Sequence, residues 1–280
     1  MEATENIEES TRIVLEEYRE LLKNYCLMDD LYMTKFFDGD KKGIQLVLRI
    51  ILDDPDLIVE EVHTQKFIAN LLERSVRLDI VAVDGKGRRF NVEVQCDNGG
   101  AVPQRARFNG SSLDVDMLGK NEPFTNLPDA YVIFITKKDV LKGGKPLYRI
   151  QRTILDMDNK PFGDGSYIIY VNGEIRDGTK LGRLMHDFFC SNPDEMHYDV
   201  LRERAKYFKQ DKEGIDTMGG SYAEIRAEGR KEGLARGLKQ GTLRSLRNLI
   251  ANVDMTVEQA MAAIGVPEEE RAVYRKELEA

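Results

Sequence analysis

The sequence of 280 residues is poor in cysteine and contains no apolar run long enough to cross a membrane. Its three cysteines lie far apart and form no CxxC pair; they are Cys26, Cys96 and Cys190. This spacing argues against a disulfide framework, a zinc ribbon and a CxxC redox motif, and it suits a reducing compartment. A membrane span requires about 18 or more consecutive apolar residues, and the first residues lack the basic start and apolar stretch of a signal peptide. We therefore expect a cytoplasmic protein without a membrane partner.

Signatures of several enzyme classes are absent as well. The stretch Asp84-Gly-Lys-Gly is no nucleotide-binding loop, because a strand rather than a helix is expected to follow it. Ser111-Ser112 lacks the flanking glycines of a nucleophile elbow, so we expect no hydrolase triad. The histidines show no metal-ligand spacing, and we expect structural roles for all three: His63, His186 and His197. The net charge, from 41 Lys+Arg and 49 Asp+Glu, is −8, so any contact with nucleic acid requires a local basic patch.

The hydrophobic pattern predicts helices and strands in an order typical of an α/β or α+β protein rather than of a bundle or a sandwich. Two helices come first, then a strand and a β-hairpin, then one helix, three strands and two helices. In chain order these segments are 7–25, 41–52, 57–67, 76–95, 101–118, 131–136, 147–155, 167–171, 181–189 and 198–208. We assign residues 1–210 to one domain and residues 211–280 to a helical extension that ends in two short helices.

The extension is distinguished by its glycines. Three of them, at 214, 219 and 220, suggest a hinge, and four more recur every fourth residue along one helical face: Gly229, Gly233, Gly237 and Gly241. Residues 221–250 carry seven basic residues against three glutamates. Three interpretations stay open for this segment: a solvated charged helix, a helix that packs closely in a homo-oligomer, or an added nucleic-acid clamp.

The predicted hairpin brings two acidic residues together. A turn centred near Gly85 and Lys86 sets Asp79 opposite residue 92 or 93, so Asp79 and Glu93 become cross-strand neighbours with Cβ atoms about 5 Å apart. Like charges in these positions repel each other, and a divalent cation between them would relieve the repulsion. Carboxylate oxygens suit Mg²⁺ or Mn²⁺, which can activate water and polarise a phosphate. The alternative is an edge hairpin whose acids face solvent.

Gln95 lies two residues beyond Glu93, on the same face of the strand. Its amide can orient an attacking water or contact a phosphate oxygen. Unlike a lysine, it brings no positive charge.

Residues 74–95, RSVRLDIVAVDGKGRRFNVEVQ, resemble the signature of the PD-(D/E)XK nuclease family transposases, the Rpn recombination-promoting nucleases. Further blocks follow the family's order, among them HTQKFIANLLERSVRLD, QRARFNGSSLDVDML, LPDAYVIFIT and LGRLMHDFFC. Together the blocks and the glycine-punctuated tail cover most of residues 27–250. The resemblance implies a restriction-endonuclease-like α/β fold with an αβββαβ core, in which helices flank a mixed sheet, followed here by the helical C-terminal extension.

The family's first motif acid corresponds to Asp79, and its E-x-Q, a variant of (D/E)-x-K, corresponds to Glu93-Val94-Gln95. The resemblance thus implies that Asp79 and Glu93 bind Mg²⁺ or Mn²⁺ and that the Val94 carbonyl adds a ligand. Asp79, Glu93 and Gln95 would be the catalytic residues. Because glutamine replaces the usual lysine, the departure implies slow activity, a second cation or a loss of catalysis.

Arg105 and Arg107 follow the hairpin on a predicted helix whose counterpart in the family is also basic, and we expect them to hold the DNA backbone. The alternative is a solvated helix face with ordinary surface arginines. Gln65 and Arg77 flank the proposed site and are further candidates for nucleic-acid contacts. Two neighbouring acids of the preceding segment are candidates for one further acid at the site: Glu60 and Glu61.

We predict a Mg²⁺-dependent DNA endonuclease of low sequence specificity, linked to recombination or mobile DNA. The alternative is a catalytically inactive protein on a nuclease fold that binds nucleic acid or self-associates through the C-terminal helix. A nuclease directed at RNA is a third possibility. Hydrolysis alone does not join strands and no further strand-transfer motif is present, so we do not expect complete transposition.

Overall fold

The computed structural model of the chain describes residues 19–68, 75–96, 98–253 and 255–279. It divides the sequence into two compact units, residues 1–219 and 220–280. The expected domain boundary near residue 210 stays a prediction. The helix predicted for 7–25 falls largely outside the described residues, and residues 19–24 are helical.

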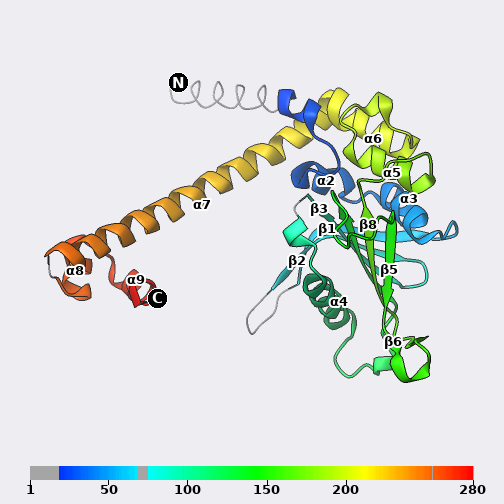
Figure 1. Cartoon of the computed structure of the whole chain (residues 1–280). Helices are drawn as coiled ribbons and strands as arrows, with labels where there is room; N and C mark the ends of the chain where they lie inside the picture. Colours follow the sequence, from blue (N-terminus) through cyan, green and yellow to red (C-terminus); the bar gives the residue numbers. More distant parts are fainter. Residues whose placement is uncertain (1–18, 69–74, 97, 254, 280) are drawn as a thin grey trace. The chain divides into compact units, whose positions relative to one another are not determined.

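The first unit is built around a mixed sheet flanked by helices, as the sequence predicts (Figure 1). Its strands in spatial order are β1 (Val59–Ile68), β2 (Val76–Asp84), β3 (Arg89–Gln95), β4 (Ala130–Thr136), β8 (Ser166–Asn172) and β5 (Leu147–Gln151). β3, β4 and β8 run parallel to one another, whereas the pairs β1–β2, β2–β3 and β5–β8 are antiparallel. The apolar run that forms β4 therefore lies between two parallel neighbours, where both faces of a strand are usually covered.

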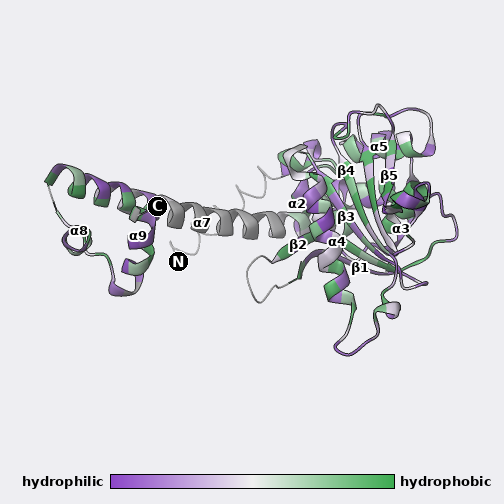
Figure 2. Cartoon of the chain, turned by 60° about the horizontal axis from the view of Figure 1, so that its bottom comes forward, coloured by the Kyte–Doolittle hydropathy of each residue, from purple (hydrophilic) through white to green (hydrophobic). Residues whose placement is uncertain are grey.

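Helices pack against this sheet from several directions. They are α2 (Asp30–Phe37), α3 (Lys41–Leu52), α4 (Pro103–Met117), α5 (Lys180–Phe189) and α6 (Asp199–Gln210). α4 contacts β2, β3 and β4, α2 and α3 contact β1, and α5 and α6 contact α3. Buried apolar side chains such as Val81, Leu113 and Phe134 fill the layer between α4 and the sheet. The strands show long hydrophobic stretches in Figure 2, as expected for strands covered by helices.

The β2–β3 hairpin has the predicted position and register. Ile80 pairs with Val92 and Val81 with Asn91, and continuing this register by one residue sets Asp79 opposite Glu93. The turn is organised mainly by Asp84, whose Oδ1 accepts hydrogen bonds from the backbone N–H groups of residues 86 and 88 at 3.0 and 2.9 Å. Of the two turn glycines, only the second takes a left-handed backbone, with φ +78° at residue 87.

One predicted strand is interrupted. The segment 147–155 forms β5 only as far as Gln151, and Thr153–Ile154 becomes β6, which pairs with β7 (Lys160–Pro161) in a separate two-stranded sheet. The predicted single strand is therefore wrong beyond residue 151, because the chain leaves β8 there and turns into a second hairpin.

The three glycines that suggest a hinge lie at 214, 219 and 220, within helix α7 (Lys212–Val253). The boundary between the two units falls between residues 219 and 220, and the hinge stays a prediction. Gly214 has a packing role, since a Cβ at this position would lie 2.1 Å from the carbonyl oxygen of Tyr207 on α6.

The second unit has a small core of its own. It comprises the later part of α7, α8 (Val257–Ala263) and α9 (Glu268–Glu279), and its buried side chains are Leu243, Leu246, Ala260, Met261, Val266 and Tyr274. The two short helices at the end are as predicted, and Gly265, with φ +72°, follows α8. Within the described part of the chain, no helix is both long and apolar enough to cross a bilayer.

Candidate functional site

The two predicted acids meet at the open end of the β2–β3 hairpin. The backbone N–H of Asp79 donates to Oε1 of Glu93 at 3.2 Å, and the backbone N–H of Val94 donates to Oδ2 of Asp79 at 3.1 Å. Each carboxylate thus reaches the backbone of the opposite strand. The predicted convergence of Asp79 and Glu93 has a geometric basis in these two bonds.

Asp79 is electrostatically unfavourable as an anion in the free protein. Burial, as the largest cause, and the charges of Glu93 and Asp30 together raise the pKa of Asp79 to about 7. The Val94 N–H and the charge of Arg105 lower the pKa, but they only partly offset these effects. The site therefore holds a proton near neutral pH, which a cation could replace.

Glu93 is fully buried and is held by a chain of buried amides. The Nδ2 of Asn91 donates to Oε1 of Glu93 at 2.8 Å, and the Nδ2 of Asn109 on α4 donates to Oδ1 of Asn91 at 3.1 Å. Both asparagines are fully buried as well. Because a buried carboxylate needs hydrogen-bond donors, these amides hold the Glu93 side chain in position. The sequence offered one signal for Asn91, its place two residues before Glu93 on the same strand face, and none for Asn109.

Arg105 also contacts the carboxylate of Glu93. Its Nη2 lies 2.5 Å from Oε2 of Glu93, and its Nη1 donates to the carbonyl of Gly100 at 3.2 Å. The guanidinium also lies over the ring of Phe134, with its carbon 5.9 Å from the ring centroid. The structure thus adds a contact that sequence reasoning did not anticipate, since Arg105 pairs with a site carboxylate.

Gln95 lies at the end of β3, where a glycine makes room for its side chain. A Cβ on Gly100 would come within 2.1 Å of the Gln95 Oε1 and 3.2 Å of the Arg105 Nη1. Gly100 therefore permits the amide of Gln95 and the guanidinium of Arg105 to share one side of the site.

A further acid comes from α2 rather than from β1. A cavity of about 350 Å³ at the strand ends is lined by Asp79, Val94 and Gln95 together with Met28, Asp29, Asp30 and Cys96. Asp30 is the first residue of α2, where the helix dipole stabilises a negative charge. Sequence reasoning missed Asp29 and Asp30, although an acidic pair directly before an apolar helical run is a recognisable helix-start signal.

The expectation that Glu60 or Glu61 supplies this acid is wrong. Glu61 pairs with Val83, close to the hairpin turn, and Glu60 lies against Gly85 in that turn. Both are exposed and occupy the opposite end of the hairpin from Asp79. The antiparallel register decides this, because residues near the start of β1 must face the end of β2.

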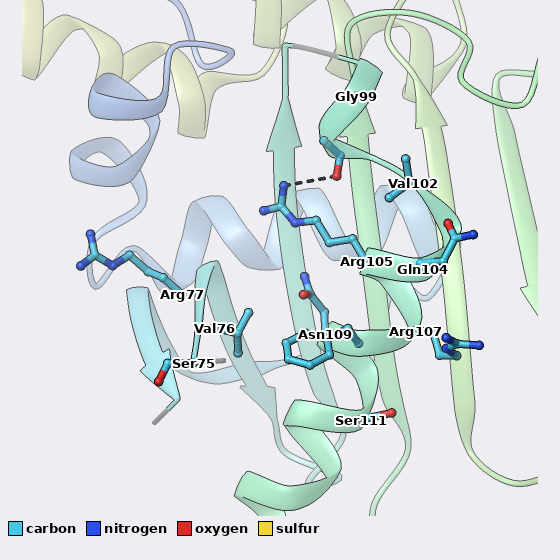
Figure 3. Close-up of a pocket in the computed structure, with 12 residues that line it drawn as sticks. Ser75, Val76, Arg77, Gly99, Val102, Gln104, Arg105, Arg107, Asn109 and Ser111 are labelled. Carbon is cyan, nitrogen blue, oxygen red and sulfur yellow. Dashed lines mark hydrogen bonds between the residues drawn. The ribbon is translucent and has the colours of Figure 1, made fainter. Parts of the chain in front are cut away.

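Three of the predicted nucleic-acid contacts line a second, larger cavity beside Glu93 (Figure 3). Arg77, Arg105 and Arg107 line this cavity of about 730 Å³, and no acidic residue is among its described lining residues. In the figure Arg105 extends from α4 toward Gly99, while Arg77 and Arg107 lie on opposite sides of the view. We call this cavity the arginine cavity.

Gln65, the fourth predicted contact, points elsewhere. Its Nε2 donates to Oγ1 of Thr34 at 3.1 Å and to Oδ1 of Asp30 at 3.5 Å. Gln65 thus belongs to the neighbourhood of the acids and not to the arginine cavity. Its left-handed backbone, with φ +51°, is uncommon for a residue other than glycine.

The donor set fits a hard divalent cation. The candidate ligands are oxygens of the carboxylates of Asp79 and Glu93 and of the Val94 carbonyl, and Asp30 lines the same cavity as Asp79. Burial and the charge of Glu93 raise the pKa of Asp79, and a bound cation would favour its ionised form. Glu93 can share its carboxylate between an ion and Arg105, since a carboxylate has about four lone-pair sites and three are used.

The mixed sheet, its flanking helices and the acid pair at the ends of adjacent strands define a PD-(D/E)XK nuclease-like α/β fold. Residues 39–175 match the family model of the PD-(D/E)XK nuclease family transposases. The family indicates a nuclease-like function linked to transposition and a DNA substrate, and its nucleases generally use divalent metal ions. The comparisons with curated proteins and with solved structures gave no match.

Proposed function

We propose that the protein is a Mg²⁺- or Mn²⁺-dependent DNA endonuclease of low sequence specificity that acts in recombination or on mobile DNA. The observation that carries the proposal is the convergence of Asp79 and Glu93, each bonded to the other strand's backbone, in an oxygen-rich site. A divalent ion bound there would polarise the scissile phosphate and lower the pKa of a bound water.

Asp79, Glu93 and the Val94 carbonyl are the proposed ligands, with Asp30 as an additional acid. Asp79 gives up its proton when it binds a cation, because its pKa of about 7 keeps it partly protonated in the free protein at neutral pH. Asn91 and Asn109 keep the carboxylate of Glu93 directed toward Asp79.

Gln95 and Arg105 together replace the lysine that usually follows the second acid in this family's motif. Gln95 lines the same cavity as Asp79, so its amide can hydrogen-bond an attacking water or a phosphate oxygen. Arg105 supplies the positive charge that glutamine lacks, and Gly100 allows the two side chains to lie together. A fixed cation at this position stabilises the charge that develops on the phosphate.

The arginine cavity is the proposed path of the DNA backbone. Arg77 and Arg107 are exposed, and with Arg105 they provide three guanidinium groups along one cavity. Guanidinium groups bind phosphate in bidentate fashion without reading sequence, which agrees with low specificity. Arg107→Ala should weaken DNA binding and lower the slope of log K against log salt by about 1.

Nicking of supercoiled plasmid by the full chain, with Mg²⁺ and with EDTA, tests the proposal. Asp79→Asn and Glu93→Gln should abolish cleavage, whereas Glu61→Gln is the matched control because it removes an exposed carboxylate at the far end of the same hairpin. Cleavage that persists in Asp79→Asn, or that is indifferent to divalent ions, would remove the proposed site.

A second candidate function is DNA binding without cleavage. Two observations favour it: glutamine stands at position 95, and Arg105 already neutralises Glu93. This candidate predicts salt-sensitive retention of DNA in a gel shift and no product with any divalent ion. Self-association through α7 belongs to the same candidate, and sedimentation of the full chain would detect it.

We also propose that the protein works in the cytoplasm. Its three cysteines are free thiols in the structure, as a reducing compartment would keep them. Fractionation of cells that produce the protein would test this placement.

A further inference from the structure

Two histidines on either side of the turn between α5 and α6 lie next to a buried carboxylate. His186 and Asp187 lie near the end of α5, and His197 precedes α6. The ring centroids of His186 and His197 are 4.6 Å apart, and ligand atoms of all three residues lie within 4.8 Å of one another. The sequence shows no metal-ligand spacing for these histidines, but the turn between α5 and α6 brings this pair close together.

The spacing of the ligand atoms is close to that of a tetrahedral site. The Nδ1 of His186 lies 3.2 Å from Oδ1 of Asp187. Two ligand atoms bound to Zn²⁺ at about 2.0–2.1 Å in tetrahedral geometry are separated by about 3.3 Å. His197 is exposed, so its ring can rotate toward the same point.

The carboxylate of Asp187 is preoriented for such a role. Its side chain is fully buried, and its two oxygens accept hydrogen bonds from the backbone N–H groups of His197 at 2.7 Å and Tyr198 at 2.9 Å. Oδ1 also lies within hydrogen-bond distance of the His186 Nδ1, and about one of the four lone-pair sites of the carboxylate is left over. Hydrogen bonds of this kind hold a ligating carboxylate in place and are a regular part of metal sites.

We propose that His186, Asp187 and His197 bind one divalent transition-metal ion of the Zn²⁺ class. Two imidazoles and one carboxylate are a ligand set for Zn²⁺ and similar ions and a poor one for Mg²⁺, which prefers oxygen ligands. The ion links the end of α5 to the start of α6, and a water molecule can take its fourth coordination position. This site is separate in residues and in chemistry from the oxygen site of Asp79 and Glu93.

The test uses the untagged full chain, Zn²⁺ as the probe and excess Mg²⁺ throughout, so that the oxygen site is occupied. Calorimetry should show one Zn²⁺ bound per chain, and Zn²⁺ should raise the thermal unfolding temperature. His186→Ala and His197→Ala should each weaken Zn²⁺ binding by at least about 100-fold, since loss of an outer-shell partner alone costs about 10–100-fold.

His63→Ala is the matched control. His63 is exposed, and its Nε2 lies 3.8 Å from a carboxylate oxygen of Glu61. Among the residues that the structure describes, His63 is not part of a group of three possible metal ligands. Its loss should leave Zn²⁺ affinity unchanged. Unfolding in EDTA checks the fold of each variant, and His197→Ala carries the test if His186→Ala is unstable, because His197 is exposed. Absence of Zn²⁺ binding by the parent chain, or equal binding by the parent and His197→Ala, overturns the proposal.

Discussion

Replacing Asp79 by asparagine should stabilise the free protein, and the gain should grow with pH. The pKa of Asp79 is about 7 in the folded protein, against 3.8 for an unperturbed aspartate, chiefly because of burial and the charge of Glu93. Between these two values the folded chain holds a proton that the unfolded chain has lost. The stability of the parent protein therefore falls as pH rises through this window and stays low above pH 7.

The magnitude follows from the same two pKa values. Each unit of pKa difference corresponds to about 1.4 kcal/mol, so ionised Asp79 destabilises the fold by up to about 4 kcal/mol above pH 7. Between pH 5 and pH 7 the penalty grows by up to about 3 kcal/mol. Asparagine has no such dependence, and its amide oxygen can still accept the hydrogen bond from the Val94 N–H.

Urea unfolding at pH 5 and pH 8, in EDTA and without divalent ions, measures this effect. Asp79→Asn should be more stable than the parent at pH 8 and should lose most of that advantage at pH 5. Glu61→Gln, an exposed change on the neighbouring strand, should stay within about 0.5 kcal/mol at both values. A gain that is equal at the two pH values, or a loss of stability at pH 8, would refute the electrostatic reasoning.

Two further substitutions test how the site is held. Gly100→Ala places a Cβ within 2.1 Å of the Gln95 Oε1, so Gln95 must move. We therefore expect plasmid nicking to fall by at least about tenfold. Gly110→Ala is the control: its Cβ would have its nearest contact at 3.6 Å, and the nicking rate should stay unchanged. Asn91→Ala removes a buried hydrogen-bond donor to Glu93 and should lower the free energy of unfolding by about 1–3 kcal/mol in urea titrations. A change below about 0.5 kcal/mol would show that the two asparagines do not hold the carboxylate of Glu93.

The sequence predicted the hairpin well because its signals are local. Alternating β-branched residues on both sides of Asp84-Gly-Lys-Gly set the strands and the register, and the register alone places Asp79 opposite Glu93. The apolar run of β4 and the amphipathic pattern of α5 are equally local, and both elements lie where predicted. Failures occur where local pattern carries no information, as at residues 152–155, where the chain leaves one sheet for another.

The composition of the site beyond the acid pair could not be predicted in this way. Asn109 is linked to Glu93 only through Asn91, and Asp30 lines the same cavity as Asp79 because α2 begins beside the ends of the strands. Both arrangements join segments that are far apart in the chain, so no spacing rule connects them. The choice of Glu60 or Glu61 as the further acid failed for the same reason, since proximity in sequence to the hairpin says nothing about which end of β1 approaches Asp79.

The sequence by itself determined the pairing of Asp79 with Glu93, the glutamine two residues further on and the alternation of helices and strands around them. These features follow from period-2 side-chain alternation and turn geometry within about twenty residues of chain. Only the tertiary structure decided that Arg105 neutralises Glu93, that Asp30 joins the acids and that His186 meets His197. Such contacts depend on how helices dock on the sheet, and docking is set by the packing of the whole core rather than by any one segment.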